Sequence, residues 1–295
     1  MIQSHYDEFG LFHENIAEFA LGLVTVPVVA RVTASLADGR EISALKWGSG
    51  DPQLVLVHGG GQNAHTWDTV ALDLGVDLLA VDLPGHGHSA WSETGEYPLE
   101  TMADEVATAV ATHAPNARLV VGMSLGGLTS LVLASRHAHL VRNLTLVDIT
   151  PGVTPTKVKA VTDFINGPQT FPSFEDLLRR TLEHNPTRSE SSLRRGILHN
   201  AKQLADGTWQ WKYDRRRAHG GREQIVSSDL WSLVDRLACP VNLVRGALSP
   251  VVDDEDVAEL VRRRPDAAVH VVDGAGHSVQ GDRPRELTRI LRALL

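Results

Sequence analysis

The sequence predicts an α/β fold in which a mostly parallel sheet is flanked by helices and interrupted by one insertion. Short apolar runs such as "QLVLVHGGG" and "RLVVGMS" recur along the chain and end in glycine, proline, aspartate or serine, which is typical of strands buried on both faces. Helical patterns separate these runs, as in βαβ units. Residues 151–235 contain no such run, and the alternation resumes after them.

The first expected elements are a short helix and a hairpin. The opening stretch "MIQSHYDEFGLFHENIAEF" carries acidic residues where a secretory signal would need basic and then apolar ones, so we expect an amphipathic helix there. Next, "VVARVTAS" and "REISALKW" flank the dipeptide Asp38-Gly39, which is typical of a hairpin turn. Two antiparallel strands therefore open the predicted sheet.

Six further strands are expected to complete an eight-stranded sheet. Four of them precede the insertion and two follow it, at 53–61, 77–85, 118–124, 143–152, 240–246 and 267–277. The helices between and after them are expected at 66–73, 99–113, 125–137, 253–264 and 284–295. Continuous apolar strands joined by helices predict parallel pairing over this part of the chain.

Residues 151–235 are predicted to form a helical cap inserted after the sixth strand, with residues 1–150 and 236–295 as the core. The stretches "SFEDLLRRTLEHN" and "ESSLRRGILHNAKQL" have helical patterns. The stretch "TWQWKYD" places Trp209, Trp211 and Tyr213 on one face of an extended piece. For these rings, packing between cap and core is favoured over lining a ligand pocket.

Composition and charge exclude several classes of protein. A hydrophobic fraction of 42% and a charged fraction of 22% match soluble globular proteins rather than disordered ones. A net charge of -8 argues against a nucleic-acid partner, which would need clustered Lys and Arg. No apolar run reaches the roughly 20 residues that insert across a membrane. The oligomeric state is not predicted.

The only cysteine is Cys239. An internal disulfide and a cysteine-based metal site are therefore excluded, and a reducing, cytoplasmic environment is expected.

The stretch "LVVGMSLGGLTS" sets Ser124 between Gly122 and Gly126, in the pattern G-x-S-x-G. It follows a predicted strand and precedes a predicted helix, which is where a nucleophile elbow must lie. Small residues at the two glycine positions leave room for a strained turn that exposes the hydroxyl. Ser124 is therefore the candidate nucleophile, and a plain glycine turn is the alternative.

A serine hydroxyl needs a base within hydrogen-bond reach, and the chain offers fourteen histidines. We select His277 because it lies in the loop after the last predicted strand and follows Ser124 in the chain order expected of this arrangement. The alternative is a loop histidine bonded to backbone. His58, His86 and His88 are expected to shape loops rather than to bind a metal.

The stretch "VHGGGQNAHTW" follows the third predicted strand and supplies flexible backbone beside the elbow. We expect the N–H of Gly60 and the N–H of Leu125 to form an oxyanion hole, with Gly61 as the competing candidate for Gly60.

The motifs "HGGGQ", "DLPGHGHS", "GMSLGG" and "GAGHSVQ", in this order and with an insert after "VDITPG", resemble the α/β-hydrolase superfamily. The resemblance is closest to its bacterial serine carboxylesterases with a lid, and it covers the chain from about Val28. It implies the α/β-hydrolase fold and acyl transfer through a serine. It also implies that neither a metal nor an organic cofactor takes part.

The triad acid is where the sequence departs from the family. The usual aspartate falls in the loop after the seventh strand, where this chain has Ser249, and a serine carries no charge to orient the histidine. Asp148, which ends the sixth strand, is the favoured replacement, because some family members carry the acid there. Asp253 or Asp254 and the absence of a charged acid remain alternatives. The two aspartates lie at a predicted helix start, where a capping role competes. Asp82 is expected to be structural.

These residues predict a serine hydrolase that cleaves small or short-acyl esters through an acyl-enzyme on Ser124, with His277 as the base and Asp148 as the acid. One alternative is hydrolysis of a carbon-carbon bond in dienoate-type substrates, for which Arg194, Arg195 or Arg217 could bind a dianion. Another is a ligand-binding protein that keeps the fold without catalysis.

Overall fold

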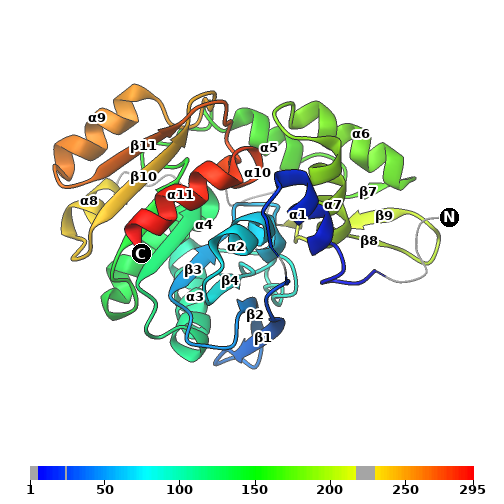
Figure 1. The fold of residues 1–295 in the computed structure, drawn as a ribbon, viewed down its shortest axis with the longest axis horizontal. Helices are drawn as coiled ribbons and strands as arrows, with labels where there is room; N and C mark the ends of the chain where they lie inside the picture. The colour runs from blue at the N-terminus through cyan, green and yellow to red at the C-terminus, as the bar shows by residue number, and fades with distance from the viewer. Residues whose placement is uncertain (1–5, 24, 217–229) are drawn as a thin grey trace.

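A computed structural model describes residues 6–23, 25–216 and 230–295 of the 295-residue chain. Eight strands form one sheet in the order β1-β2-β4-β3-β5-β6-β10-β11 (Figure 1). Their bounds are β1 Val29–Ser35, β2 Glu41–Trp47, β3 Leu54–Val57, β4 Leu78–Val81, β5 Leu119–Met123, β6 Leu144–Val147, β10 Val241–Gly246 and β11 Ala268–Val272. The strand β2 is antiparallel to both of its neighbours, and all other pairs are parallel. The predicted fold class is confirmed.

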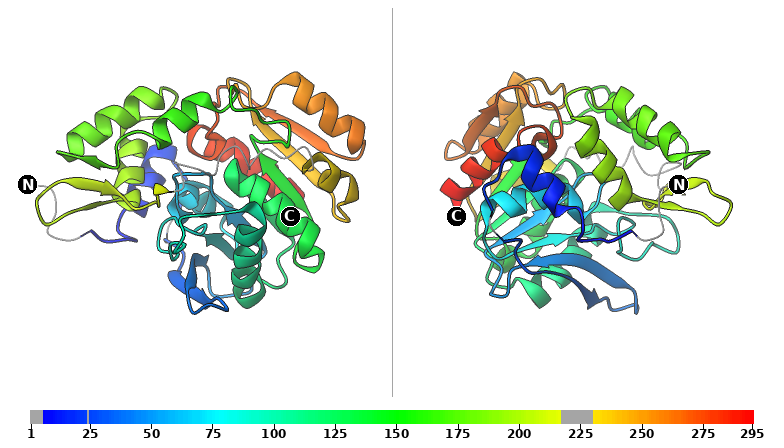
Figure 2. Two further views of the ribbon diagram at one scale, coloured as in Figure 1. Left: turned by 180° about the vertical axis from the view of Figure 1, so that it is seen from behind. Right: turned by 45° about the vertical axis from the view of Figure 1, so that its right-hand side comes forward.

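Both faces of the sheet are covered by helices. The helices α1, α2 and α11 cover one face, at Phe12–Phe19, Asp68–Leu74 and Pro284–Leu294. The helices α3, α4, α8 and α9 cover the other, at Leu99–His113, Leu125–Arg136, Leu230–Arg236 and Asp254–Arg263 (Figures 1 and 2). The sequence of β3 is uniformly apolar because both of its faces are buried. Leu54 and Leu56 enter one core cluster, and Val55 and Val57 enter the other.

Short helical turns complete the core. They are η1 Ala64–Trp67, η2 Ala138–Leu140 and α10 Val279–Asp282. In the described part of the chain, no helix has both the length and the apolar character needed to cross a bilayer.

The inserted segment, residues 151–235, is only partly helical. Its helices are α5 Lys159–Ile165, α6 Phe174–His184 and α7 Glu190–Asn200, of which α7 lies beside α1 (Figures 1 and 2). Three short strands form a separate antiparallel sheet beside the helices, namely β7 Thr170–Phe171, β8 Ala201–Gln203 and β9 Trp209–Trp211. The strand β9 lies in the extended piece expected from the sequence. The strands β7 and β8 are too short to produce a recognisable pattern.

Aromatic side chains hold this second sheet to its helices. Trp209 and Trp211 are buried in a cluster with Phe171 and Phe174, and the ring of Tyr213 stacks on that of Trp211. The period-two aromatic pattern therefore builds the core of the inserted segment. The helix α8, although within residues 151–235 except for its last residue, packs against α4 of the main core.

Candidate active site

Ser124 lies at the junction of β5 and α4 in a strained backbone conformation. Its φ of 51° and ψ of -118° place a non-glycine residue in the positive-φ region, which costs on the order of 1–3 kcal/mol. Only Ala20 and Asp148 share a positive φ among the described non-glycine residues. This geometry matches the nucleophile elbow expected from the sequence.

The two glycines of the motif are required by close backbone approach. A Cβ atom on Gly122 would lie 2.4 Å from the carbonyl oxygen of Gly126, and a Cβ on Gly126 would lie 2.4 Å from the carbonyl oxygens of Val57 and His58. These contacts involve backbone, which cannot move aside without shifting β3. The glycines therefore allow α4 to start directly against the sheet edge.

Asp148 and His277 are joined by a hydrogen bond. His277 Nδ1 lies 2.7 Å from Asp148 Oδ2, and the Asp148 side chain is fully buried. The backbone N–H of Gly246 donates to the other carboxylate oxygen at 2.9 Å. With Nδ1–H donated to the carboxylate, His277 Nε2 keeps a lone pair. Among the described residues this buried nitrogen has no hydrogen-bond partner.

Ser249 contributes a donor to the same carboxylate. Its hydroxyl makes a short hydrogen bond to Asp148 Oδ2, and its oxygen accepts the N–H of Val251 at 3.2 Å. In the sequence, Ser249 is visible only as the residue that replaces the usual acid, and nothing there indicates its role as a donor. Asp148 follows β6, the strand next to β10, and its carboxylate reaches His277 from there.

The competing aspartates have other partners. Asp253 caps α9 through the N–H of Asp256 and pairs with Lys157 at 2.8 Å, and the hydrogen bond from Lys157 lowers the pKa of Asp253. Asp254 is almost fully exposed and pairs with Arg245 at 2.8 Å. The capping role weighed against these residues is therefore observed for Asp253.

The order of the sheet explains why distant residues meet. Ser124 follows β5, Asp148 follows β6, and His277 follows β11, while β5, β6, β10 and β11 are consecutive neighbours. Because parallel strands end at one edge, the loops after them lie together, which is where open α/β sheets bind ligands. The Ser124 N–H also donates to the carbonyl of Val147, directly before Asp148.

The loop after β3 lies against the elbow. A Cβ on Gly59 would lie 3.3 Å from Ser124 Cβ, and a Cβ on Gly60 would lie 3.7 Å from Leu125 Cδ2. The N–H of Gly61 donates to His86 Nε2 at 3.0 Å, so it is already occupied. No hydrogen bond from the N–H of Gly60 or of Leu125 is found within the described ranges. Gly60 thus has the freer donor of the two candidates.

The remaining loop residues are structural, as expected. His58 Nε2 accepts the N–H of Leu83 at 2.9 Å. Asp82 accepts the N–H of Ala64 at 2.7 Å and pairs with Arg31 at 2.8 Å. Burial by itself would raise the pKa of Asp82, but Arg31 and the backbone donors hold that pKa below its usual value. This buried carboxylate fixes the entry to η1.

Residues of the inserted segment cover the glycine loop. A Cβ on Gly61 would lie 3.1 Å from Ile165 Cγ1 and 3.7 Å from a ring carbon of Tyr213. The amide of Asn200 donates to the carbonyl of Gly61 and accepts from Asn63. The end of α5 and the end of α7 therefore form a roof over this loop.

The arginines considered for a dianionic substrate are otherwise engaged. Arg194 pairs with Glu14 at 3.1 Å, and Arg195 pairs with Glu18, both carboxylates belonging to α1. Arg217 lies outside the described residues. These contacts join α7 to the N-terminal helix rather than leaving two guanidinium groups available to a ligand.

Comparison with known proteins identifies relatives over nearly the whole chain. Residues 52–284 match the sequence profile of the alpha/beta hydrolase fold. Esterase Rv0045c of Mycobacterium tuberculosis is 45% identical over 98% of this chain and 96% of its own length. Its solved structure, described together with its inhibition by transition metals, has a TM-score of 0.86 at 44% identity and covers 98% of both chains.

A more distant relative is the 2-(acetamidomethylene)succinate hydrolase of Mesorhizobium japonicum, which is 29% identical over 80% of this chain and 85% of its own length. A solved structure of E-2-(acetamidomethylene)succinate hydrolase has a TM-score of 0.81 at 25% identity and covers 90% of this chain and 99% of its own.

Proposed function

Because the chain belongs to the alpha/beta hydrolase fold family, we propose that it is a serine carboxylesterase acting through Ser124, His277 and Asp148. The observation that carries the proposal is the hydrogen bond from His277 to the buried Asp148, at the sheet edge that also bears the strained Ser124. The name of the M. tuberculosis relative, an esterase, supports ester hydrolysis in this chain.

In the proposed mechanism, His277 Nε2 removes the Ser124 hydroxyl proton as the oxygen attacks the ester carbonyl carbon. The N–H groups of Gly60 and Leu125 then hold the negative oxygen of the tetrahedral intermediate. When the bond to the alkoxide breaks, the imidazolium of His277 returns its proton to the leaving alcohol. Water, deprotonated by His277, then attacks the acyl carbon. The bond to Ser124 Oγ breaks, His277 returns the proton to that oxygen, and the carboxylic acid is released.

Asp148 keeps the Nδ1–H tautomer of His277 in place and stabilises the imidazolium formed during each half-reaction. The hydroxyl of Ser249 and the N–H of Gly246 hold the carboxylate in turn. Together with His277 Nδ1–H, these groups give the carboxylate three hydrogen-bond donors, which fix its orientation towards the imidazole. Asp148 thus supplies the charge that Ser249 lacks, and Ser249, at the position where the family usually has its acid, orients Asp148 instead.

Small or short-acyl esters are the proposed substrates, because Ile165 of the roof and the ring of Tyr213 lie close to the glycine loop and leave little room for a long acyl chain. Carbon-carbon bond hydrolysis loses the support of Arg194 and Arg195, since both pair with carboxylates of α1. A ligand-binding protein without catalysis would be expected if no acid met His277, since Ser249 stands where the family usually has its acid. The hydrogen bond between Asp148 and His277 removes that argument.

The test is labelling with a serine-directed fluorophosphonate, followed by turnover of p-nitrophenyl esters of increasing acyl length and of a dienoate ring-cleavage product. We expect labelling of wild type, none of Ser124→Ala, and the fastest turnover on the shortest esters. Ser130→Ala, which changes another buried serine of α4, is the matched control and should label normally. Absence of labelling in the folded wild-type protein would refute the esterase proposal.

The cap at 151–235 as a separate unit, the cytoplasmic location and the absence of nucleic-acid partners remain predictions from the sequence.

A further inference from the structure

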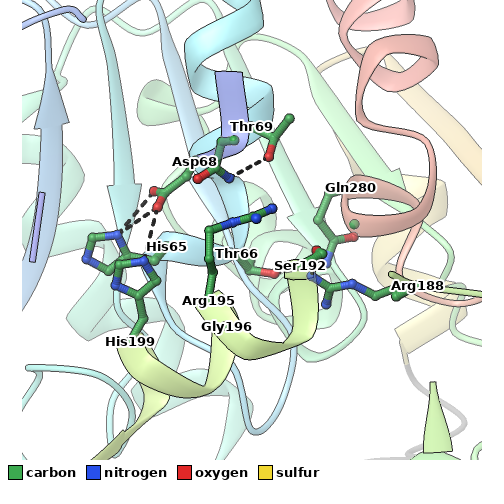
Figure 3. A pocket seen from close by; sticks show the side chains of 12 residues that line it. His65, Thr66, Asp68, Thr69, Arg188, Ser192, Arg195, Gly196, His199 and Gln280 are labelled. Carbon is green, nitrogen blue, oxygen red and sulfur yellow. Dashed lines mark hydrogen bonds and ion pairs between the residues drawn. The ribbon is translucent and has the colours of Figure 1, made fainter. Parts of the chain in front are cut away.

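Three buried side chains, none of them part of the proposed triad, meet between the core and the inserted segment. They are His65 of η1, Asp68 at the start of α2 and His199 near the end of α7 (Figure 3). One nitrogen of each imidazole and one carboxylate oxygen lie within 4.8 Å of one another. Two imidazoles and a carboxylate form a ligand set that binds Zn²⁺ and other divalent transition metals.

The separations between these atoms suit a common metal ligand sphere. His65 Nδ1 lies 2.9 Å from Asp68 Oδ2, and His199 Nε2 lies 3.7 Å from the same oxygen. Ligand atoms about 2.1 Å from a metal ion and roughly 90 to 110° apart lie about 3.0 to 3.4 Å from each other. The observed distances bracket this range, so small adjustments suffice.

In each imidazole, the nitrogen that would not bind the metal has a hydrogen-bond partner. Glu8 Oε1 lies 3.1 Å from His65 Nε2, and the hydroxyl of Tyr6 lies 2.6 Å from His199 Nδ1. Metal-binding histidines commonly have such an outer partner, which fixes the ring and raises its basicity. Here both partners come from the segment before α1, so the N-terminal residues complete the arrangement.

His199 Nε2 is the atom of the cluster that remains available to bind an ion. The His199 side chain is 3% exposed, and among the described residues its Nε2 has no hydrogen-bond partner. It borders a cavity of about 30 Å³ that Asp68 and His65 also line, which is room for an ion or a water molecule. A buried ring nitrogen without a partner is uncommon in folded proteins.

One ring must turn for both nitrogens to point at a single ion. The imidazoles of His65 and His199 stack with centroids 3.8 Å apart and planes 7° from parallel. His65 is bonded at both nitrogens whereas His199 is bonded at one. We therefore expect His199 to rotate about its χ2 angle by an amount that keeps the hydrogen bond between its Nδ1 and the hydroxyl of Tyr6.

Nearby cations do not occupy the cluster. Arg195 pairs with Glu18. Lys212 donates to the carbonyl of His199, and Arg188 donates to Ser192 at the opposite end of the cavity (Figure 3). The charges directly on the imidazoles are the carboxylates of Asp68 and Glu8, which favour a bound cation.

We propose that His65, Asp68 and His199 bind one divalent transition-metal ion, with Zn²⁺ as the reference ion and water as a further ligand. The ion takes no part in the ester chemistry. It would tie α7 to the stretch that follows the glycine loop, because His199 belongs to one and His65 to the other. Asn200, the neighbour of His199, already bonds to the carbonyl of Gly61, so the ion would restrain the roof against this loop.

The test is calorimetric titration of chelator-treated protein with ZnCl₂, with Co²⁺ as a spectroscopic probe of imidazole ligation. We expect one tight equivalent in wild type and a loss of affinity of about 100-fold or more in His65→Gln and His199→Gln. Glu8→Gln and Tyr6→Phe should weaken binding about 10- to 100-fold, as outer partners do. The exposed His139→Gln should bind like wild type, which separates this site from surface histidines.

Circular dichroism checks that each variant is folded. Absence of a stoichiometric Zn²⁺ site in wild type, or wild-type affinity in folded His199→Gln, overturns the proposal. If His199→Gln does not fold, Glu8→Gln and Tyr6→Phe decide, and unchanged affinity in both overturns it. The measurement does not depend on ester turnover, so it is independent of the function proposed above.

Discussion

The carboxyl edge of the main sheet and the inserted segment above it are held in place by different kinds of contact. At the sheet edge, the backbone N–H of Asp148 donates to the carbonyl of Val244 at 2.7 Å, and the N–H of Ser124 donates to the carbonyl of Val147 at 3.1 Å. The inserted segment is joined to its surroundings largely through polar side chains, such as Asn200 on Gly61 and Arg195 on Glu18.

Backbone contacts within a sheet are independent of side-chain identity, whereas side-chain pairs change with a single substitution. We infer that the geometry of the proposed catalytic edge depends less on single side chains than that of the roof, where substitutions would change substrate preference. The predictions below test this division.

The largest effect is expected for Asp148→Asn, which changes the catalytic edge directly. An asparagine cannot stabilise the imidazolium of His277 and favours the wrong tautomer, so kcat should fall by about 10⁴-fold. Steady-state kinetics on a short-acyl p-nitrophenyl ester measures it. Asp253→Asn and Asp254→Asn should leave kcat close to wild type, and the reverse pattern would assign the acid to the loop after β10.

Asp82→Asn should lower stability by about 3 kcal/mol, because it leaves Arg31 without its fully buried partner. The folded pKa of Asp82 lies below its usual value. Its contribution is therefore complete above the unfolded pKa and is lost as the pH falls through the folded one. Urea unfolding between about pH 7 and about pH 3 should show a weaker pH dependence in the variant than in wild type. Equal slopes for both proteins would contradict this account.

Ser249→Ala should lower kcat about tenfold with little change in KM, because one hydrogen bond to the charged Asp148 is removed. The loss should be much smaller in an Asp148→Asn background, since the two side chains act as one unit. A double-mutant cycle on kcat measures this coupling. Additive effects would mean that Ser249 acts elsewhere.

The smallest effect is expected for Ile165→Ala in the roof. Removing this side chain above Gly60 and Gly61 should raise kcat/KM for longer acyl chains about tenfold relative to short ones, while kcat on the shortest ester changes little. A panel of esters of increasing acyl length tests it. An equal loss on every ester would place Ile165 with the catalytic edge instead.

Local patterns were sufficient to predict much of the core. Buried strands show uninterrupted apolar runs, and the glycines beside Ser124 mark a turn that other residues cannot make. Each of these signals lies within a few consecutive residues and can therefore be recognised in the sequence without a structure. In the inserted segment, only β9 falls in the extended piece expected from the sequence, because β7 and β8 are too short to establish a period.

The choice among the acids required the fold. Asp148 and Asp253 are both carboxylates near strand ends, and only the neighbouring positions of β6, β10 and β11 bring the first of them to His277. The donor role of Ser249 depends on the same adjacency, so no motif could have indicated it.

The sequence by itself determined the fold class and the candidate nucleophile and base, because each rests on chemistry within one short segment. Only the tertiary structure decided which acid meets His277 and that His65, Asp68 and His199 converge. His65 and His199 are far apart in the chain, and neither neighbourhood resembles a metal-binding motif. Contacts of this kind arise when the chain folds back on itself, and linear spacing carries no record of them.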